Sequence, residues 1–97
     1  MREYELMYIA RPNLPPEQYE ALQARIAELI TRDGGEMTGV DVWGARKLAY
    51  PIKHQTEGYY VVLTFKGGDE LVRELNRVLS ITDEFLRFKI FRIDKRK

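Results

Sequence analysis

The chain has 97 residues, of which 44% are hydrophobic and 32% charged, with a formal net charge of +1. This length predicts one domain over residues 1–97, and the composition is typical of a folded globular protein. Cysteine is absent, which excludes disulfides, thiolate nucleophiles and cysteine metal sites. The N-terminal stretch lacks a signal-peptide core, and no segment approaches the roughly 20 apolar residues of a membrane span. We therefore expect a cytoplasmic protein without membrane contact.

The charges are unevenly distributed along the chain. Residues 44–54 include three Lys or Arg and no acid, and residues 85–97 have a net charge of +5, part of it in a short basic end from about residue 94. Residues 17–36 instead contain five acids and two arginines. The two basic segments predict a single basic patch if the fold brings them together.

The first two predicted elements are a strand and a helix. Residues 2–10 alternate, with Tyr4, Leu6 and Tyr8 on one side, which is the period of a strand. The proline-rich segment 11–16 ends this strand, because proline lacks the backbone donor of the ladder. From residue 17 the period is helical, and the glycine pair 34–35 ends the helix. The apolar stripe of this helix comprises Tyr19, Leu22, Ile26, Leu29 and Ile30.

A hairpin, a second helix and a last strand follow. Residues 37–52 predict a long strand with bends or bulges at Gly39 and Gly44, residues 53–58 a turn, and residues 59–65 the returning strand. Both faces of the returning strand are apolar, so its inward side stays open. After the glycine pair 67–68, a helical stripe comprises Leu71, Val72, Leu75, Val78 and Leu79. Residues 85–93 alternate again, with Leu86, Phe88 and Ile90 on one side and Phe85, Arg87, Lys89 and Phe91 on the other.

The order strand, helix, strand, strand, helix, strand predicts an α+β ferredoxin-like fold, a four-stranded antiparallel sheet with two helices on one face. The other face of the sheet would be open. Met7, Ile9 and Phe91 are expected to be exposed there, beside Lys89, and an apolar patch framed by charge usually marks a protein partner. We therefore expect a partner-protein surface at Met7, Ile9, Lys89 and Phe91.

Catalytic and metal sites have little support in the sequence. His54 is the only histidine and lies in a predicted turn. No His/Asp/Glu cluster has the spacing of metal ligands, and we predict no cofactor and no metal. Some enzymes of this fold bind an acyl phosphate in a glycine-bearing loop after the first strand. Here that loop has no glycine and is rich in proline, so only Arg11 and Asn13 keep a small-ligand or acyl-phosphate enzyme as an alternative.

RNA-recognition domains of this fold stack bases on aromatic residues of the third strand. Gly58, Tyr59 and Val62 fit their motif, but the leading cation and both later aromatic positions do not. A domain that stacks bases in this way is therefore a poor fit.

The segment Gly44–Ile52, with the sequence GARKLAYPI, combines cations with an apolar run. Alternation places Arg46 on the side of Leu48, Tyr50 and Ile52, and Lys47 on the other side. One interpretation is that both cations only protect a hairpin edge from aggregation. The other is that this acid-free cluster, with Lys53 and His54, contacts phosphate and sugar groups.

The same two interpretations apply to the last strand. Arg87 and Lys89 face away from the predicted core, which suits a binding surface. The other interpretation is that both cations only form ion pairs with Glu3 and Glu5, because the first and last strands are neighbours in this fold.

The chain also resembles the bacterial small-subunit ribosomal protein six family over nearly its whole length. The resemblance is strongest in Gly44–Ile52, followed by Lys53 and Gly58-Tyr59, and extends to Arg2–Glu5, Asn13-Leu14 and Arg87. It implies a structural component of the small ribosomal subunit that binds the central domain of the subunit's RNA. It also implies a heterodimer with small-subunit ribosomal protein eighteen, the pair binding a helical junction of the RNA.

The matching positions make RNA-contact candidates of Arg46, Lys47, Tyr50 and Arg87. Charge and predicted position add Arg2, Lys53, His54 and Arg92. The expected mechanism is electrostatic positioning and shape recognition of folded RNA, with little base readout. The alternative is a protein-binding ferredoxin-like module without RNA affinity.

Overall fold

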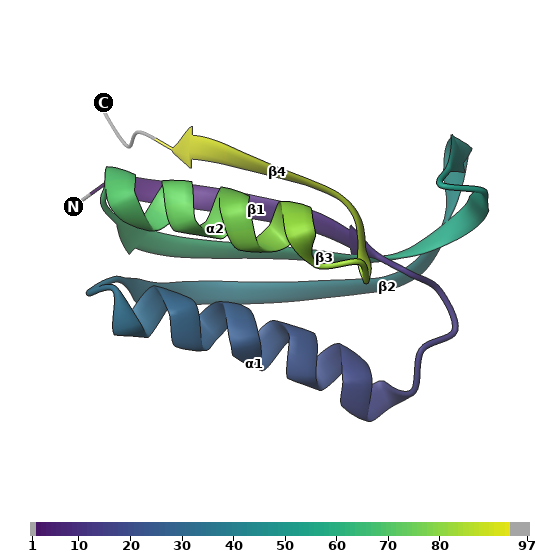
Figure 1. Ribbon diagram of the computed structural model, residues 1–97, viewed down its shortest axis with the longest axis horizontal. Coiled ribbons are helices and arrows are strands. Elements are labelled where there is room, and N and C mark those ends of the chain that lie inside the picture. The colour runs from purple at the N-terminus through teal and green to yellow at the C-terminus, as the bar shows by residue number, and fades with distance from the viewer. Residues whose placement is uncertain (1, 94–97) are drawn as a thin grey trace.

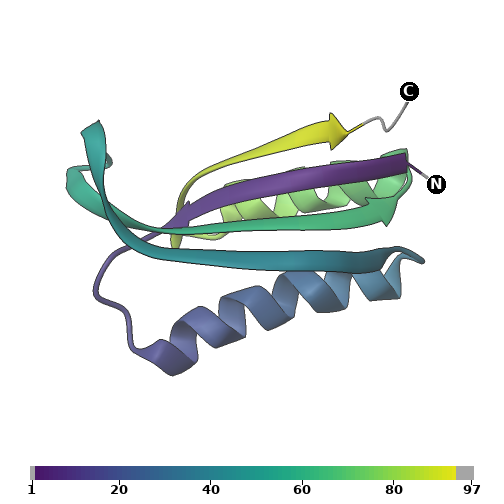
Figure 2. The same cartoon turned by 180° about the vertical axis from the view of Figure 1, so that it is seen from behind.

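The protein forms one antiparallel sheet in the computed structural model, which describes residues 2–93. The elements are β1 (Arg2–Ala10), α1 (Pro16–Arg32), β2 (Glu36–Ile52), β3 (Gln55–Gly67), α2 (Asp69–Ile81) and β4 (Phe85–Ile93). The strands lie in the order β2-β3-β1-β4, with every neighbouring pair antiparallel. Figure 1 shows α2 in front of the strands, and Figure 2 shows the strands in front of α2. The predicted α+β ferredoxin-like architecture is confirmed.

The core fills the space between the two helices and one face of the sheet. On β1, Tyr4, Leu6 and Tyr8 are buried, as their alternation predicts. The sequence left the inward side of β3 open, and the structure assigns it to Val61, Leu63 and Phe65. The helices contribute the buried residues Leu22, Ile26, Leu29, Ile30, Leu71, Leu75, Val78 and Leu79. Among residues 2–93, no helix covers the opposite face of the sheet (Figure 2).

The segment around α1 shows why the helix is bounded as predicted. Pro16 occupies the first turn, where its missing N–H costs nothing. Gly34 has a φ of +84°, a left-handed conformation that glycine adopts without steric cost, and the amide of Gly35 donates to the carbonyl of Ile30 at 2.8 Å. These contacts turn the chain directly into β2.

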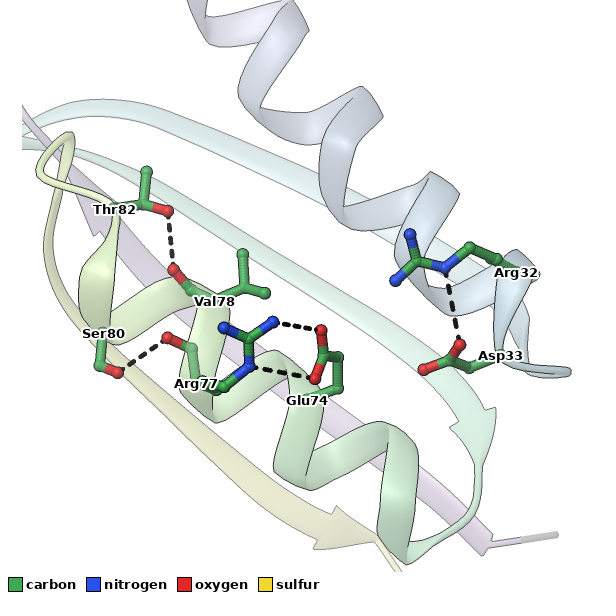
Figure 3. A network of polar contacts seen from close by, with 7 residues as sticks. All are labelled: Arg32, Asp33, Glu74, Arg77, Val78, Ser80 and Thr82. Carbon is green, nitrogen blue, oxygen red and sulfur yellow. Dashed lines mark hydrogen bonds and ion pairs between the residues drawn. The ribbon is translucent and has the colours of Figure 1, made fainter.

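The C-terminal half of α2 makes local polar contacts (Figure 3). The hydroxyl of Thr82 donates to the carbonyl of Val78 at 2.7 Å, and that of Ser80 to the carbonyl of Arg77 at 3.0 Å. The Arg77 guanidinium donates twice to the Glu74 carboxylate, at 2.7 and 3.2 Å. This hydrogen bond, with the charge of Arg77, lowers the pKa of Glu74, and the same contact raises the pKa of Arg77. The network supports the helix and lies on the helical layer of the molecule.

The hairpin turn differs from its prediction. The turn comprises only Lys53 and His54, and β3 begins at Gln55 instead of Tyr59. Both turn residues have positive φ, +50° and +67°, as tight two-residue hairpin loops require. The sequence did not indicate such a turn, because neither residue is the usual Gly, Asn or Asp. The strands of the hairpin are therefore longer than predicted at its tip.

The start of β4 also departs from strict alternation. Phe85 was predicted to share a side with Arg87, yet it is buried and packs edge-on against Tyr8, with ring centroids 5.0 Å apart. The reason is a shift of register between Ile9 and Ala10, which brings Phe85 opposite Ala10. Beyond this irregularity, β4 alternates as predicted.

Candidate nucleic-acid interface

The end of the β2–β3 hairpin, residues 44–58, projects beyond the rest of the sheet and curls away from it (Figures 1 and 2). The pairing of β1 with β3 stops at Ala10 and Tyr59, so the hairpin end has no third strand. Gly44 has a φ of +82°, and the β2–β3 register shifts there and again between Lys47 and Ile52. These irregularities bend the hairpin, and the predicted bulges at Gly39 and Gly44 are both confirmed by register shifts.

Arg46 and Lys47 lie on opposite faces of this hairpin end, and both are exposed. Arg46 is opposite Gly58, and Lys47 is opposite Glu57. Because residues paired across a ladder point to the same face, Arg46 shares the open face of the sheet. The cluster looked free of acid in the sequence, but the register brings Glu57 directly across from Lys47. Of the two cations, Arg46 therefore has the less compensated charge.

Two hydrogen bonds connect the hairpin tip to β4. The Arg87 guanidinium donates to the Tyr50 hydroxyl at 2.7 Å, and the Lys53 ammonium to the Phe85 carbonyl at 3.5 Å. The structure thus joins the two basic segments predicted to form one patch. His54 is exposed in the turn beside Lys53. We call Arg46, Lys47, Tyr50, Lys53, His54 and Arg87 the hairpin cluster.

Arg2 and Arg92 lie away from the hairpin cluster. Arg2 is opposite Gly67, at the far end of β3 from the turn, and forms an ion pair with Asp69 at 2.7 Å. Arg92 is opposite Tyr4, near the same far end. The structure does not bring either residue to the hairpin, and their RNA contact stays a prediction. The cations predicted in the basic end, residues 94–97, fall outside the described residues.

The predicted partner surface coincides with a shallow cavity of about 350 Å³ on the open sheet face. Met7 is half-buried, Phe91 is 43% exposed, and the Lys89 ammonium lies 5.6 Å from the centroid of the Phe91 ring, within cation–π range. The lining residues are Met7, Ile9, Tyr60, Arg87, Phe88, Lys89 and Phe91. Arg87 therefore belongs both to this cavity and to the hairpin cluster.

The expected exposure of Ile9 is wrong. Ile9 is only 8% exposed, because the hairpin end folds over it at Gly58. A Cβ on Gly58 would collide with Cγ2 of Ile9, so the missing side chain creates the space for this contact. Ile9 forms part of the floor of the cavity instead of its exposed rim.

The alternative of ladder ion pairs between β1 and β4 is also wrong. Arg87 lies opposite Ile9 and Lys89 opposite Met7, whereas Glu5 faces Phe91. Alternation gives the face of a residue but not its partner, so the sequence could not decide this point. Within residues 2–93, neither Arg87 nor Lys89 forms an ion pair, and both charges remain uncompensated.

One part of the open face was not predicted from the sequence. Trp43 stacks on Tyr60, with ring centroids 6.1 Å apart and an interplanar angle of 12°, and is 43% exposed. Its indole N–H donates to the Asp41 carboxylate at 3.0 Å. The available signal was a lone tryptophan next to the bulge glycine Gly44, where alternation fails. The apolar part of the open face thus extends to β2.

The loop proposed for an acyl phosphate is occupied by structural contacts. The Arg11 guanidinium donates to the carbonyl and carboxylate of Asp83, at 3.1 and 3.4 Å. The Arg11 carbonyl accepts from the Tyr19 hydroxyl at 2.6 Å. Asn13 is exposed with a φ of +65°. The cation that this alternative needs is therefore committed to holding the loop.

Among residues 2–93, no group of three or more His, Asp or Glu side chains is arranged to hold a metal ion. In the same part of the chain, none of the helices has the length and apolar character to cross a membrane.

Comparison with known proteins identifies the family. Residues 3–92 match the family model described as ribosomal protein S6. Small ribosomal subunit protein bS6 of Caldanaerobacter subterraneus subsp. tengcongensis is 49% identical, covering 97% of this chain and 99% of the relative, and that of Symbiobacterium thermophilum is 52% identical, covering 95% and 97%. The crystal structure of 30S ribosomal protein S6 from Thermotoga maritima has a TM-score of 0.89 and 36% identity, covering 95% of this chain and 87% of that one. The chain therefore belongs to the ribosomal protein S6 family, a family of cytoplasmic, non-enzymatic proteins of the small ribosomal subunit.

Proposed function

We propose that the protein binds the central domain of small-subunit ribosomal RNA through the hairpin cluster, as a heterodimer with small-subunit ribosomal protein eighteen. The observation that carries this proposal is the projecting hairpin end. Its cations are exposed, and the hydrogen bond from Arg87 to Tyr50 connects it to β4. Membership of the ribosomal protein S6 family supports the same function.

The chemistry of the hairpin cluster suits the RNA backbone. Lys and Arg side chains that neutralise phosphates release counterions, which makes the affinity fall steeply with salt. Folded RNA is recognised largely by its shape and its sugar–phosphate groups. The cluster therefore positions the protein on the RNA and reads few bases.

The cavity on the open face suits the protein partner. Its floor is apolar, and Lys89 and Arg87 provide positive charge at its rim. Since Arg87 borders both the cavity and the hairpin cluster, the partner and the RNA would occupy adjoining surfaces. A partner that contacts both the cavity and the RNA would raise the affinity of this chain for RNA.

The test is a salt titration of binding to a central-domain RNA fragment, with and without the partner protein. We expect tight, salt-steep binding that requires the partner. Arg46→Ala and Lys47→Ala should each weaken binding and reduce the salt slope by about 1, without changing the unfolding transition. Arg25→Ala, at an exposed position on α1, is the matched control. Equal salt slopes for Arg46→Ala, Lys47→Ala and the parent would contradict phosphate contact.

The exposed stack of Trp43 on Tyr60 favours a second candidate, a protein-binding module without RNA affinity. In that case the open face would bind its protein partner, and the cations would only keep the hairpin in contact with water. Phe91→Asp should then abolish partner binding, and the RNA fragment should bind neither the parent nor the complex. Salt-steep RNA binding by the complex would exclude this candidate.

A further inference from the structure

We infer that Arg87 is a positioning residue, which acts through Tyr50 to hold the hairpin end in the orientation that presents Arg46 and Lys47. This inference deepens the proposed RNA-binding function and rests on it. The sequence made Arg87 a direct RNA contact. The geometry assigns it a different role, because its guanidinium already donates to the Tyr50 hydroxyl at 2.7 Å.

The first argument is the weakness of the hairpin end by itself. Beyond Tyr59, residues 46–58 pair only with one another, and a two-stranded ribbon is at best marginally stable in water. The β2–β3 register is irregular between Lys47 and Ile52, directly before the turn. Lys53 and His54 both have positive φ, which is unfavourable for residues with a side chain. The hairpin end therefore needs outside contacts to keep one orientation.

The second argument is that both hydrogen bonds that hold the hairpin tip from outside come from β4. Arg87 binds Tyr50 on the first strand of the hairpin, and the Phe85 carbonyl accepts from Lys53 in the turn. Both β4 residues lie across the sheet from the hairpin, with β1 and β3 between them and β2. Both donors are charged, but the Arg87–Tyr50 bond is 2.7 Å long and the Lys53–Phe85 bond 3.5 Å, so the Arg87–Tyr50 bond is the stronger of the two.

The third argument is that few other contacts hold the side chains of Arg87 and Tyr50. Tyr50 is 57% exposed, so burial does not hold its ring in place. In the part of the chain that the structure describes, Arg87 forms no ion pair, and its guanidinium keeps further donors. The hydrogen bond to the Tyr50 hydroxyl thus holds the Arg87 guanidinium and the hairpin tip together. Ordering the hairpin before RNA arrives lowers the entropy cost of binding.

The test is a double-mutant cycle with Tyr50→Phe, Arg87→Met and the double variant. Tyr50→Phe removes the acceptor and keeps the ring and every charge. Amide hydrogen exchange of residues 46–58 is measured in the protein without RNA. Affinity for the central-domain RNA fragment and its salt slope are measured with the partner protein. Arg25→Met, which removes an exposed arginine from α1, controls for the loss of one positive charge.

Amide exchange in the hairpin end should be faster in both single variants than in the parent, and it should be unchanged in Arg25→Met. Each single variant should bind RNA about fivefold more weakly, the effect of one net hydrogen bond of about 1 kcal/mol. The double variant should be no weaker than Arg87→Met, and Tyr50→Phe should keep the parent's salt slope.

Two outcomes would overturn the inference. Unchanged hairpin exchange in both single variants would mean that the hydrogen bond does not order the hairpin. Additive losses, with a salt slope reduced by about 1 in Arg87→Met alone, would make Arg87 a direct phosphate contact. Faster hairpin exchange in a protein that binds no RNA, even as the parent, would instead contradict the proposed function and leave the positioning role of Arg87 supported.

Discussion

The body of the sheet and the hairpin end are held in place by different forces. In the body, strands have neighbours on both sides or helices across one face, and buried side chains fix their positions. In the hairpin end, most side chains are exposed, and two hydrogen bonds to β4 fix the tip. The difference teaches that the stability of the fold resides in the body, whereas the proposed binding surface lies in the hairpin end, so substitutions should separate the two.

The largest expected effect comes from a core residue of the body. Leu6 is 0% exposed at the centre of β1, and Leu6→Ala should lower the free energy of unfolding by about 2–5 kcal/mol. Leu48→Ala in the hairpin end removes a side chain that is only half-buried, so it should cost less. Urea unfolding measures both losses. Equal losses would break the distinction between the two regions.

The next effect is expected where the two regions meet. Gly58→Ala places a methyl group against Ile9, and overpacking of this kind costs about 1–3 kcal/mol. Ile9→Ala should reopen the space, so Gly58→Ala should cost less in that background than in the parent. Urea unfolding of the four proteins in this cycle measures the coupling. Strictly additive losses would mean that Gly58 is not the point where the hairpin rests on the body.

The same division explains what the sequence could predict. In the body, alternation and helical stripes gave the fold, the helix faces and most of the buried residues, because burial follows periodicity. In the hairpin end, alternation predicted the opposite faces of Arg46 and Lys47 but not the position of Glu57 or the two-residue turn. The exposed stack of Trp43, directly before the hairpin end, was not predicted either. The bulges at Gly39 and Gly44 were predictable from the two glycines, but the register and the positive φ of Lys53 and His54 depend on tertiary contacts, which leave little trace in composition. The burial of Ile9 belongs to the same class, since only the position of Gly58 across the sheet explains it.

A third prediction tests the body through pH. Burial raises the pKa of the Tyr8 phenol above its usual value of 10.0, and the charge of Tyr59 adds to this. Above pH 10 the unfolded chain therefore loses this proton while the folded chain keeps it, so stability falls as pH rises, by up to about 1.4 kcal/mol per pH unit. Urea unfolding at pH 9 and pH 11 should show a smaller fall for Tyr8→Phe than for the parent. An identical fall would mean that Tyr8 ionises as readily in the folded state.

The smallest effect is expected on the surface of α2, away from both regions. Arg77→Met removes the hydrogen bond and the charge that lower the pKa of Glu74, so this pKa should rise toward its ordinary value. An NMR titration of the Glu74 carboxyl measures the change, and RNA affinity should stay that of the parent. A loss of RNA affinity would mean that the binding surface extends onto the helical layer and is not limited to the hairpin end.

The central place of β1 has a consequence for the protein as it is made. The strand at the start of the described chain has β3 on one edge and β4 on the other, with Glu3 opposite both Lys66 and Ile93. A nascent chain on a translating ribosome therefore carries an unpaired first strand until the segments for β3 and then β4 have been synthesised. Closing such long-range pairs is slow compared with local structure. Because Arg87 lies in β4, the hydrogen bond from Arg87 to Tyr50 forms only after this last strand has been synthesised, and the proposed order of the hairpin end would come with it. An incomplete copy would then compete poorly for the RNA that we propose as the ligand.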